Sequence, residues 1–275
     1  MTHHPRKPLR FALIGWGAIN RRIVELLAER DGGTDFVVAA IGVRNAAGAG
    51  DVPAGAMVIT TPDALEGLDL DLDLVVEAAG RESVGIWGEA ALRSAPAFAV
   101  ASTSAFCDTA LLDRLVATAE AHGSQILIPP GALAGIDAIA AASVLPLDEV
   151  VHRIVKPPSA WRGTPVESLV ALDELTEATS FFIGTAREAA SRFPQNANVA
   201  VISALAGLGL DRTRVELVAD PAAGGNGHQL SARGDFGKLE IAIENRPLAS
   251  NRKSSEMTAL GLVRLIENRV RPLVR

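Results

Sequence analysis

The sequence predicts an α/β fold in which a doubly wound parallel sheet is followed by a second, α+β domain. Short apolar runs alternate with helix-compatible segments through the first half of the chain, as in a parallel sheet with crossover helices. A glycine turn directly follows the first apolar run, and near residue 240 the pattern changes to an alternation of apolar residues with polar or small ones. The length of 275 residues suits two domains.

Composition excludes several classes of protein. A single cysteine excludes a disulfide scaffold, and charged residues interrupt every apolar stretch before it reaches the ~20 residues of a membrane span. The formal charge of -6, without a basic stripe, argues against nucleic-acid or membrane partners. The basic start runs directly into the first strand rather than into a signal peptide, so we expect a cytoplasmic protein that acts on a small molecule.

The glycine turn lies between the apolar run 11–14 and a helix-compatible stretch at 21–30. Gly15 permits a tight turn, and Gly17 lets backbone N–H groups approach a pyrophosphate at the start of the helix. Asn20 stands where the motif usually has a third glycine, so the motif leaves the packing of helix on strand less certain. An ordinary strand-to-helix turn is the alternative. We predict a Rossmann-type dinucleotide site at Gly15, Gly17, Ala18 and Ile19.

A second buried strand is predicted at 36–43, and it ends at Arg44. An acidic residue at this point usually binds the ribose hydroxyls of NAD, whereas an arginine can receive the 2′-phosphate of NADP. Arg44 therefore admits NADP as well as NAD as the cofactor. A solvated arginine at a strand end is the alternative interpretation.

The remaining strands and helices of the first domain follow the same pattern. We predict strands at 57–60, 74–77, 97–100 and 124–128, and helices at 83–92 and 108–122. The turn of residues 77–80, with Ala79, and the polar segment 101–104 both follow strands. They should therefore lie at the carboxyl edge of the sheet, where such folds bind their ligand, and Ala79 becomes a candidate cofactor residue.

Prolines and glycines at 129–137 indicate a crossing between domains. Beyond it we predict an apolar helix at 197–210, a half-buried antiparallel strand at 240–245, and a final helix at 255–270 that packs onto the first domain. The expected division is a dinucleotide-binding Rossmann domain at 1–130, completed by the C-terminal helix within 250–275, and an α+β substrate domain at 131–249.

Four segments of the chain resemble the L-aspartate dehydrogenase family. They are 15–19, 131–137, 193–200, and 227–228 together with the turn 234–237. The resemblance spans nearly the whole chain, and these segments are more specific than the glycine turn alone. Pro130 departs from the family, which commonly has serine before this Gly-Ala pair, so a hydroxyl contact at the crossing is in doubt.

This resemblance implies an NAD(P)-dependent enzyme that oxidatively deaminates L-aspartate. The products would be iminosuccinate, then oxaloacetate and ammonia, in a reversible reaction that feeds NAD biosynthesis. The resemblance also implies that Ala132 and Asn198 contact NAD, that His228 is catalytic, and that the protein is a homodimer.

The proposed chemistry requires a base, because the α-ammonium must lose a proton before the nitrogen lone pair can form the imine. Histidine exchanges protons near neutrality with its ordinary pKa of about 6.5, so His228 is assigned general acid/base catalysis. A histidine that binds a backbone carbonyl in the glycine-rich segment 224–228 is the alternative. Likewise, Asn198 can cap the apolar helix, and Ala132 can simply belong to a compact turn.

A dicarboxylate substrate needs cations or hydroxyls as partners. The candidates are Lys156, Arg162, Thr164 and Lys253. Lys156 precedes two prolines, and His152 can share its strand face, although solvated lysines and structural histidines are the commoner case. Cys107 lacks an adjacent base, and no cluster has metal-ligand spacing, so neither a thiol nucleophile nor a metal is expected.

Two alternative functions remain open. The same architecture serves enzymes of the homoserine dehydrogenase or dihydrodipicolinate reductase type, which act on another small amino acid or semialdehyde. A catalytically silent nucleotide-binding sensor would bind the cofactor without turning over any amino acid.

Overall fold

The computed structural model describes residues 7–31, 35–68 and 70–274. The chain divides into two compact units. The first unit comprises Met1–Pro129 and Thr258–Arg275, and the second comprises Pro130–Met257. The units divide between Pro129 and Pro130 and again between Met257 and Thr258, where the sequence-based domain limits are 130 and 250.

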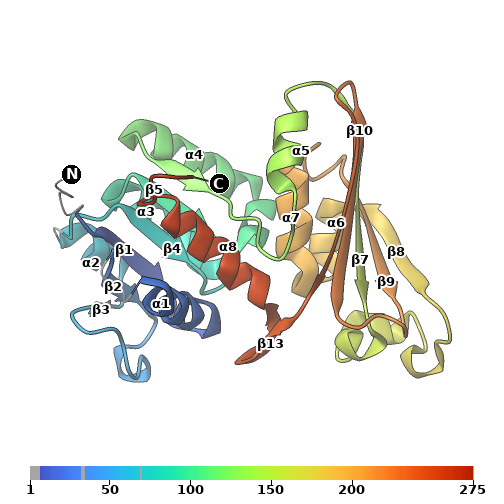
Figure 1. Cartoon of the computed structure of the whole chain (residues 1–275), viewed down its shortest axis with the longest axis horizontal. Helices are drawn as coiled ribbons and strands as arrows, with labels where there is room; N and C mark the ends of the chain where they lie inside the picture. Colours follow the sequence, from blue (N-terminus) through green and yellow to red (C-terminus); the bar gives the residue numbers. More distant parts are fainter. Residues whose placement is uncertain (1–6, 32–34, 69, 275) are drawn as a thin grey trace. The chain divides into compact units, whose positions relative to one another are not determined.

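The first unit is built on a six-stranded parallel sheet with strand order β3-β2-β1-β4-β5-β6 (Figure 1). The doubly wound fold predicted from the sequence is therefore confirmed. Its strands are β1 (Leu9–Ile14), β2 (Phe36–Gly42), β3 (Met57–Ile59), β4 (Leu74–Glu77), β5 (Ala97–Val100) and β6 (Gln125–Leu127). Its helices are α1 (Ala18–Asp31), α2 (Pro62–Gly67), α3 (Arg81–Ser94), α4 (Thr109–His122) and most of α8 (Glu256–Glu267).

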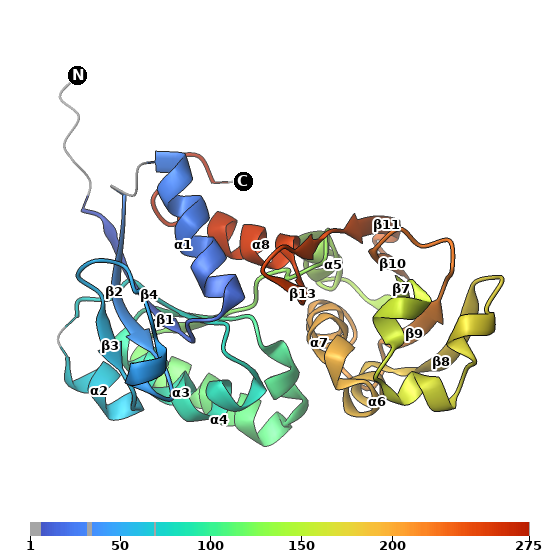
Figure 2. The same cartoon turned by 90° about the horizontal axis from the view of Figure 1, so that it is seen from below.

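Helices cover both faces of this sheet (Figure 2), with α1 and α8 on one side and α3 and α4 on the other. The apolar face of α8 joins the same core as β1, because Leu262 and Ile266 are buried with Leu13 and Ile23. The final helix therefore packs on the core of the first unit. Burying this stripe supplies hydrophobic stabilisation that the chain would lack if it ended before α8.

Asn20 fastens the glycine turn instead of weakening it. Its buried Nδ2 donates to the carbonyl oxygens of Ile14 at 3.1 Å and Gly15 at 2.7 Å. The helix also begins at Ala18, three residues earlier than the predicted start at Arg21. The expectation that loss of the third glycine makes helix packing less certain is therefore corrected: a side-chain amide ties the helix to the strand end.

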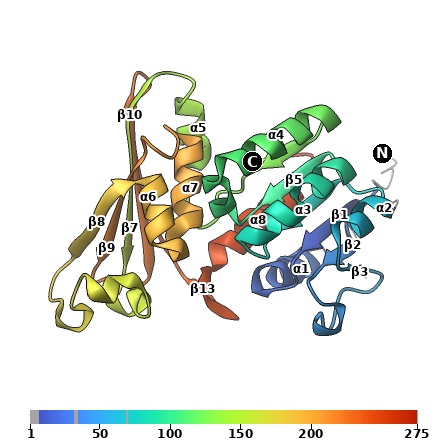
Figure 3. The ribbon, with the colours of Figure 1, turned by 180° about the vertical axis from the view of Figure 1, so that it is seen from behind.

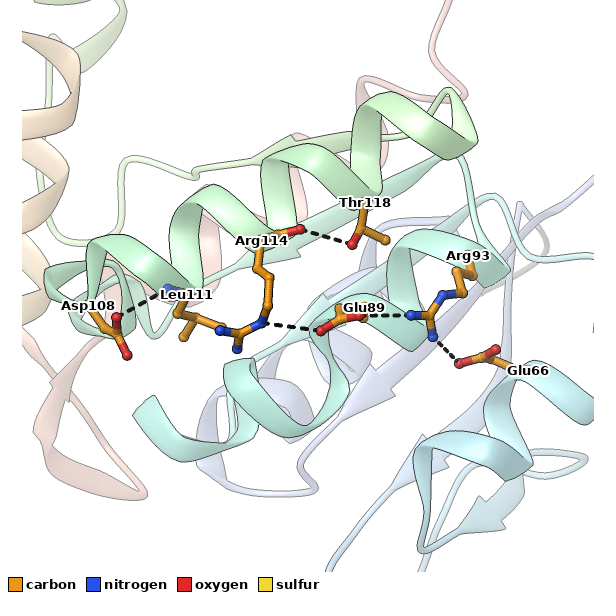
Figure 4. A network of polar contacts seen from close by, with 7 residues as sticks. All are labelled: Glu66, Glu89, Arg93, Asp108, Leu111, Arg114 and Thr118. Carbon is orange, nitrogen blue, oxygen red and sulfur yellow. Dashed lines mark hydrogen bonds and ion pairs between the residues drawn. The ribbon is translucent and has the colours of Figure 1, made fainter.

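A charged network joins the outer helices of the first unit (Figure 4). Arg93 on α3 reaches Glu66 on α2 at 2.9 Å and Glu89 at 2.8 Å, and Glu89 in turn accepts from Arg114 on α4 at 3.4 Å. The helix α4 is capped by Asp108, whose carboxylate accepts from the backbone N–H of Leu111. Because the ion pairs are exposed, each of them adds little to stability.

The second unit contains a five-stranded mixed sheet of order β11-β10-β7-β9-β8, in which only β7 and β9 pair in parallel. Figure 3 shows α5, α6 and α7 on one face of this sheet. The strands of this sheet are β7 (Leu147–Lys156), β8 (Thr179–Thr185), β9 (Arg214–Ala219), β10 (Asn226–Gly234) and β11 (Gly237–Asn245). A separate two-stranded sheet pairs β12 (Pro247–Leu248) with β13 (Asn251–Ser255). The helices of the second unit are α5 (Ile136–Ala142), α6 (Ala186–Arg192) and α7 (Ala197–Ala206).

The helix α7 ends at Ala206, four residues before the predicted end. Gly209 adopts a left-handed φ of +80° and donates its N–H to the carbonyl of Ala204, which closes the helix. Within the described residues, the structure contains no helix with the length and hydropathy needed to cross a membrane.

One buried carboxylate organises the carboxyl edge of the first sheet. Glu77, at the end of β4, accepts from the N–H groups of Ala79 and Gly80 at 2.7 and 2.9 Å. The hydroxyl of Ser83 and both the N–H and hydroxyl of Ser102 also lie within 3.0 Å of its oxygens. A single side chain thus holds the turns that follow β4 and β5 in position.

We expect Glu77→Gln to lower the free energy of unfolding by about 2 kcal/mol, because an amide nitrogen would face donors that then lack an acceptor. Urea denaturation of the two proteins measures the difference. The exposed neighbour Glu82 offers a matched control, and Glu82→Gln should change stability by less than about 0.5 kcal/mol. Equal stability of both variants would contradict the central position given to Glu77.

Candidate active site

A pocket of the first unit gathers residues from three strand ends. It is lined by the turn after β1, the end of β2 and the turn after β4. Four of the predicted cofactor residues line it: Gly15, Gly17, Arg44 and Ala79. Two further predicted cofactor residues, Ala18 and Ile19, are the first residues of α1. The structure therefore brings together segments that are more than twenty positions apart in sequence.

The geometry of the two glycines fits a dinucleotide. Gly15 has a φ of +90°, and a Cβ added there would lie 2.6 Å from the Cβ of Ala79, so the two loops approach this closely only with glycine. At Gly17 a Cβ would meet nothing within 4 Å, which leaves open space beside the backbone at the start of α1. Open backbone at a helix N-terminus is where a pyrophosphate binds in such folds.

Two arginines line this pocket. Arg44 follows β2, as predicted, and Arg81 is the first residue of α3. Both side chains are exposed. Sequence reasoning did not single out Arg81, although it directly follows the turn of residues 77–80 that was assigned to the ligand edge.

The loop after β2 is held against the glycine turn by Arg21 and Trp16. The guanidinium of Arg21 lies 4.7 Å from the ring centre of Trp16 and donates to the carbonyl of Ala49 at 2.9 Å. The indole N–H of Trp16 donates to the carbonyl of Asp51 at 2.8 Å. These contacts hold Trp16, which lines the pocket, against the loop that follows β2.

The second unit contains a buried pair of histidines. The Nε2 atom of His152 lies 3.1 Å from Nδ1 of His228, and Nδ1 of His152 lies 2.9 Å from the hydroxyl of Ser203. His228 is 4% exposed, whereas His152 and Ser203 are fully buried. The hydroxyl of Ser203 also donates to the carbonyl of Ala200, one turn earlier in α7.

Strand register explains why the two rings meet. In the β7–β10 pairing, His228 is opposite Ile154 and His152 is opposite Leu230, so the histidines are diagonal neighbours on one face of the sheet. Helix α7 brings Ser203 to His152 on this side of the sheet. The prediction noted His152 only as a neighbour of Lys156 on the strand. Ser203 was missed, although it is the one polar residue in the apolar stretch 199–206.

Burial keeps both rings neutral. Loss of solvent lowers the pKa of His152 well below its ordinary value, and the nearby His228 lowers it further. The pKa of His228 falls to about 3, first because of burial and then because of the positive charge of Lys156. The expectation that His228 titrates near neutrality therefore does not hold for the protein without substrate, in which it is a neutral acceptor at pH 7.

Lys156 completes this cluster from the end of β7. Its ammonium group donates to the side-chain oxygen of Asn196 and lies 5.0 Å from the ring centre of Trp161. Burial lowers its pKa to about 8. A lysine in this state gains from an anionic ligand, which would stabilise the charged form. Asn196 was not predicted, although it lies within the family-like segment 193–200.

The two other residues taken from the family resemblance also lie in the second unit. Ala132 is 8% exposed and its carbonyl accepts a hydrogen bond of 2.7 Å from the buried amide of Asn245. Asn198 is an exposed residue in the first turn of α7, whose N-cap position is occupied by Asn196. Asn198 therefore does not serve as the N-cap.

The remaining predicted substrate residues have local contacts. Arg162 forms an ion pair with exposed Asp173, and Thr164 accepts from the N–H of Val166 and donates to the carbonyl of Trp161. The side chain of Lys253 lies outside the described residues. Among the predicted substrate residues, Lys156 is the one that the structure brings to His228.

The cluster can accept a proton and bind an anion. His228 supplies a neutral imidazole, and Lys156 supplies an adjacent cation whose charge is felt by that imidazole. In the described part of the chain, no group of three or more His, Cys, Asp or Glu side chains is arranged to hold a metal ion.

Two family models match the chain. The C-terminal model of aspartate dehydrogenase matches residues 137–269, which include His152, Lys156 and His228. The NAD-binding domain model of homoserine dehydrogenase matches residues 15–129, which include the pocket of the first unit.

Relatives match over almost the full length. The L-aspartate dehydrogenase of Brucella anthropi is 58% identical over 94% of this chain and 95% of its own. That of Cupriavidus necator is 43% identical over 95% of this chain and 97% of its own. The structure of aspartate dehydrogenase from Thermotoga maritima has a TM-score of 0.76 at 24% identity, covering 98% of this chain and all of that one.

The neutral histidines predict how stability depends on pH. In the unfolded chain, His228 regains its ordinary pKa of about 6.5. Below that pH the unfolded chain therefore binds a proton that the folded chain does not bind, so the free energy of unfolding decreases as the pH falls. Between pH 7 and pH 5 we expect this group to cost about 2 kcal/mol, a loss that His228→Gln should not show. Urea denaturation at both pH values measures this difference.

The matched control is His122→Gln, which changes an exposed histidine at the end of α4. It should keep the pH dependence of the wild-type protein. An identical slope for wild type and His228→Gln would show that His228 is not held neutral by the fold.

Proposed function

Because this chain belongs to the L-aspartate dehydrogenase family, we propose that it oxidises L-aspartate with NAD or NADP and releases oxaloacetate and ammonia. The chain is an NAD(P)-dependent oxidoreductase with a Rossmann-type domain. The main structural support for this proposal is the neutral, buried imidazole of His228 beside the ammonium group of Lys156.

We assign His228 the proton transfers. Its neutral ring accepts a proton from the α-ammonium group, which frees the nitrogen lone pair to form the C=N bond as hydride leaves the α-carbon. The bound nicotinamide supplies the hydride acceptor. After His228 has released that proton to solvent, its neutral ring takes a proton from the water that attacks the imine carbon. His228 then returns this proton to the nitrogen as the adduct collapses to oxaloacetate and ammonia.

Lys156 is the proposed partner of a substrate carboxylate. The half-buried ammonium group of Lys156, with a pKa lowered to about 8, lacks a full counter-charge, and a carboxylate would supply it. The same anion would offset the repulsion between Lys156 and protonated His228. Substrate binding would therefore raise the pKa of His228 toward the range in which it exchanges protons efficiently.

The cofactor is proposed to lie along the glycine turn of the first unit. The backbone at Gly15, Gly17, Ala18 and Ile19 would hold the pyrophosphate, with Arg44 at the ribose and Ala79 beside the turn after β4. In the second unit, Ala132 and Asn198 are the proposed contacts to NAD. Arg162, Thr164 and Lys253 stay weaker candidates for the substrate than Lys156.

The wider setting is also a proposal. Iminosuccinate formation suits a role in NAD biosynthesis, and the family suggests a homodimer in the cytoplasm. Light scattering of the purified protein would measure the oligomeric state directly.

The test of function measures reduction of NAD and of NADP with L-aspartate, with L-homoserine and with other amino acids. L-Aspartate should be the preferred substrate, and His228→Ala should lower kcat by about 10²-fold or more while cofactor affinity is retained. Turnover of homoserine in preference to aspartate would favour the alternative enzyme class. Cofactor binding without turnover of any amino acid would favour a sensor.

Arg44→Asp should shift cofactor preference toward NAD. Losing a charge-assisted contact to the 2′-phosphate and adding a carboxylate should change the ratio of kcat/KM for NADP and NAD by about tenfold. Arg212→Asp makes the same charge change at an exposed position in the second unit and should leave the ratio unchanged. An unchanged ratio in Arg44→Asp would refute the ribose assignment.

A further inference from the structure

A chain of hydrogen bonds leads from the backbone of α7 to His228. The carbonyl of Ala200 accepts from the Ser203 hydroxyl at 3.0 Å, this hydroxyl lies 2.9 Å from Nδ1 of His152, and Nε2 of His152 lies 3.1 Å from Nδ1 of His228. All three side chains are buried. Three of the four ring nitrogens therefore have one defined partner each, so the position of each proton can be worked out.

The protons have one consistent arrangement. Ser203 has a single hydroxyl proton and donates it to Ala200, so its oxygen must accept from Nδ1–H of His152. A neutral imidazole carries one proton, which leaves Nε2 of His152 as an acceptor. That acceptor requires a proton on Nδ1 of His228, so Nε2 of His228 carries no proton.

We propose that His152 and Ser203 are positioning residues that hold His228 in the tautomer whose Nε2 atom carries the free lone pair. This inference rests on the proposed function, in which His228 accepts a proton from the substrate. Neither positioning residue touches the reacting atoms. They act by deciding which nitrogen of His228 can accept the proton.

The opposite arrangement would disable the base. If Ser203 donated to His152, its bond to Ala200 would be lost, and His152 would donate from Nε2 to His228. The proton of His228 would then sit on Nε2, where no lone pair would be left for the substrate. The backbone carbonyl of Ala200 therefore determines which atom donates and which accepts in each of these hydrogen bonds.

The same contact helps His228 after it has taken the proton. Protonated imidazole has two N–H donors, and Nε2 of His152 continues to accept one of them. A neutral acceptor offsets part of the cost of a buried positive charge near Lys156. His152 thus occupies the position that a carboxylate occupies in a Ser-His-Asp catalytic triad, but it is uncharged.

The experiment combines nitrogen-15 NMR of the imidazole side chains with steady-state kinetics on the full chain. The protein has five histidines, so the His228 signal can be assigned with His228→Gln. In the wild type we expect a proton on Nδ1 and none on Nε2. A wild-type His228 protonated on Nε2 would overturn the proposal without any further variant.

Two substitutions of His152 separate positioning from folding. His152→Leu removes the acceptor, and we expect Nε2–H on His228 and a kcat about 10²-fold lower, with little change in KM for the cofactor. His152→Gln keeps an amide oxygen that can accept from Nδ1–H, so it should restore the tautomer and most of the kcat. Full activity of a folded His152→Leu protein would refute the proposal.

Further variants guard against misinterpretation. Ser203→Ala should produce a mixture of His228 tautomers and a smaller loss of kcat, whereas exposed His122→Gln should change neither measurement. If the wild-type protein did not oxidise aspartate, the proposed function would fail while the tautomer measurement still stood. The two proposals therefore fail by different results.

Discussion

The burial of two neighbouring imidazole rings, His152 and His228, is the constraint on which the second unit depends. The face of the mixed sheet that carries His152 and His228 is also the face on which α7 packs, so the rings are dehydrated when the core forms. Dehydration penalises the charged form, and the nearby ammonium group of Lys156 penalises it again for His228. The fold thus maintains a neutral base at neutral pH and leaves stability sensitive to acid.

In the first unit, by contrast, the buried titratable side chain is the carboxyl group of Glu77. There a charged side chain is buried, and N–H and hydroxyl donors from the turns after β4 and β5 surround it. A buried charge with enough donors rigidifies its neighbours. The turn that carries Ala79 and the start of α3 is consequently held at the edge where the glycine turn and Arg44 line the proposed cofactor pocket.

The two units divide the chemistry. The first offers open backbone at Gly17 and two arginines, which suits the phosphates and ribose of a dinucleotide. The second offers a proton acceptor and a cation in a region poor in water, which suits an amino acid with a second carboxylate. The family membership and the chemistry of the described residues agree on an aspartate dehydrogenase.

Sequence by itself determined the strand, glycine turn and helix order of the first domain, and its predicted strands lie within two residues of the observed limits. Those features depend on local periodicity and on residues that are neighbours in the chain. Resemblance to a family selected His228, and Lys156 was proposed from its charge and its place before two prolines. Only the tertiary structure decided that His152 and Ser203 meet His228, that Asn196 meets Lys156, and that Asn20 fastens the first turn. Those contacts depend on register across strands and on helix packing, and a pKa depends on the solvent that such packing removes.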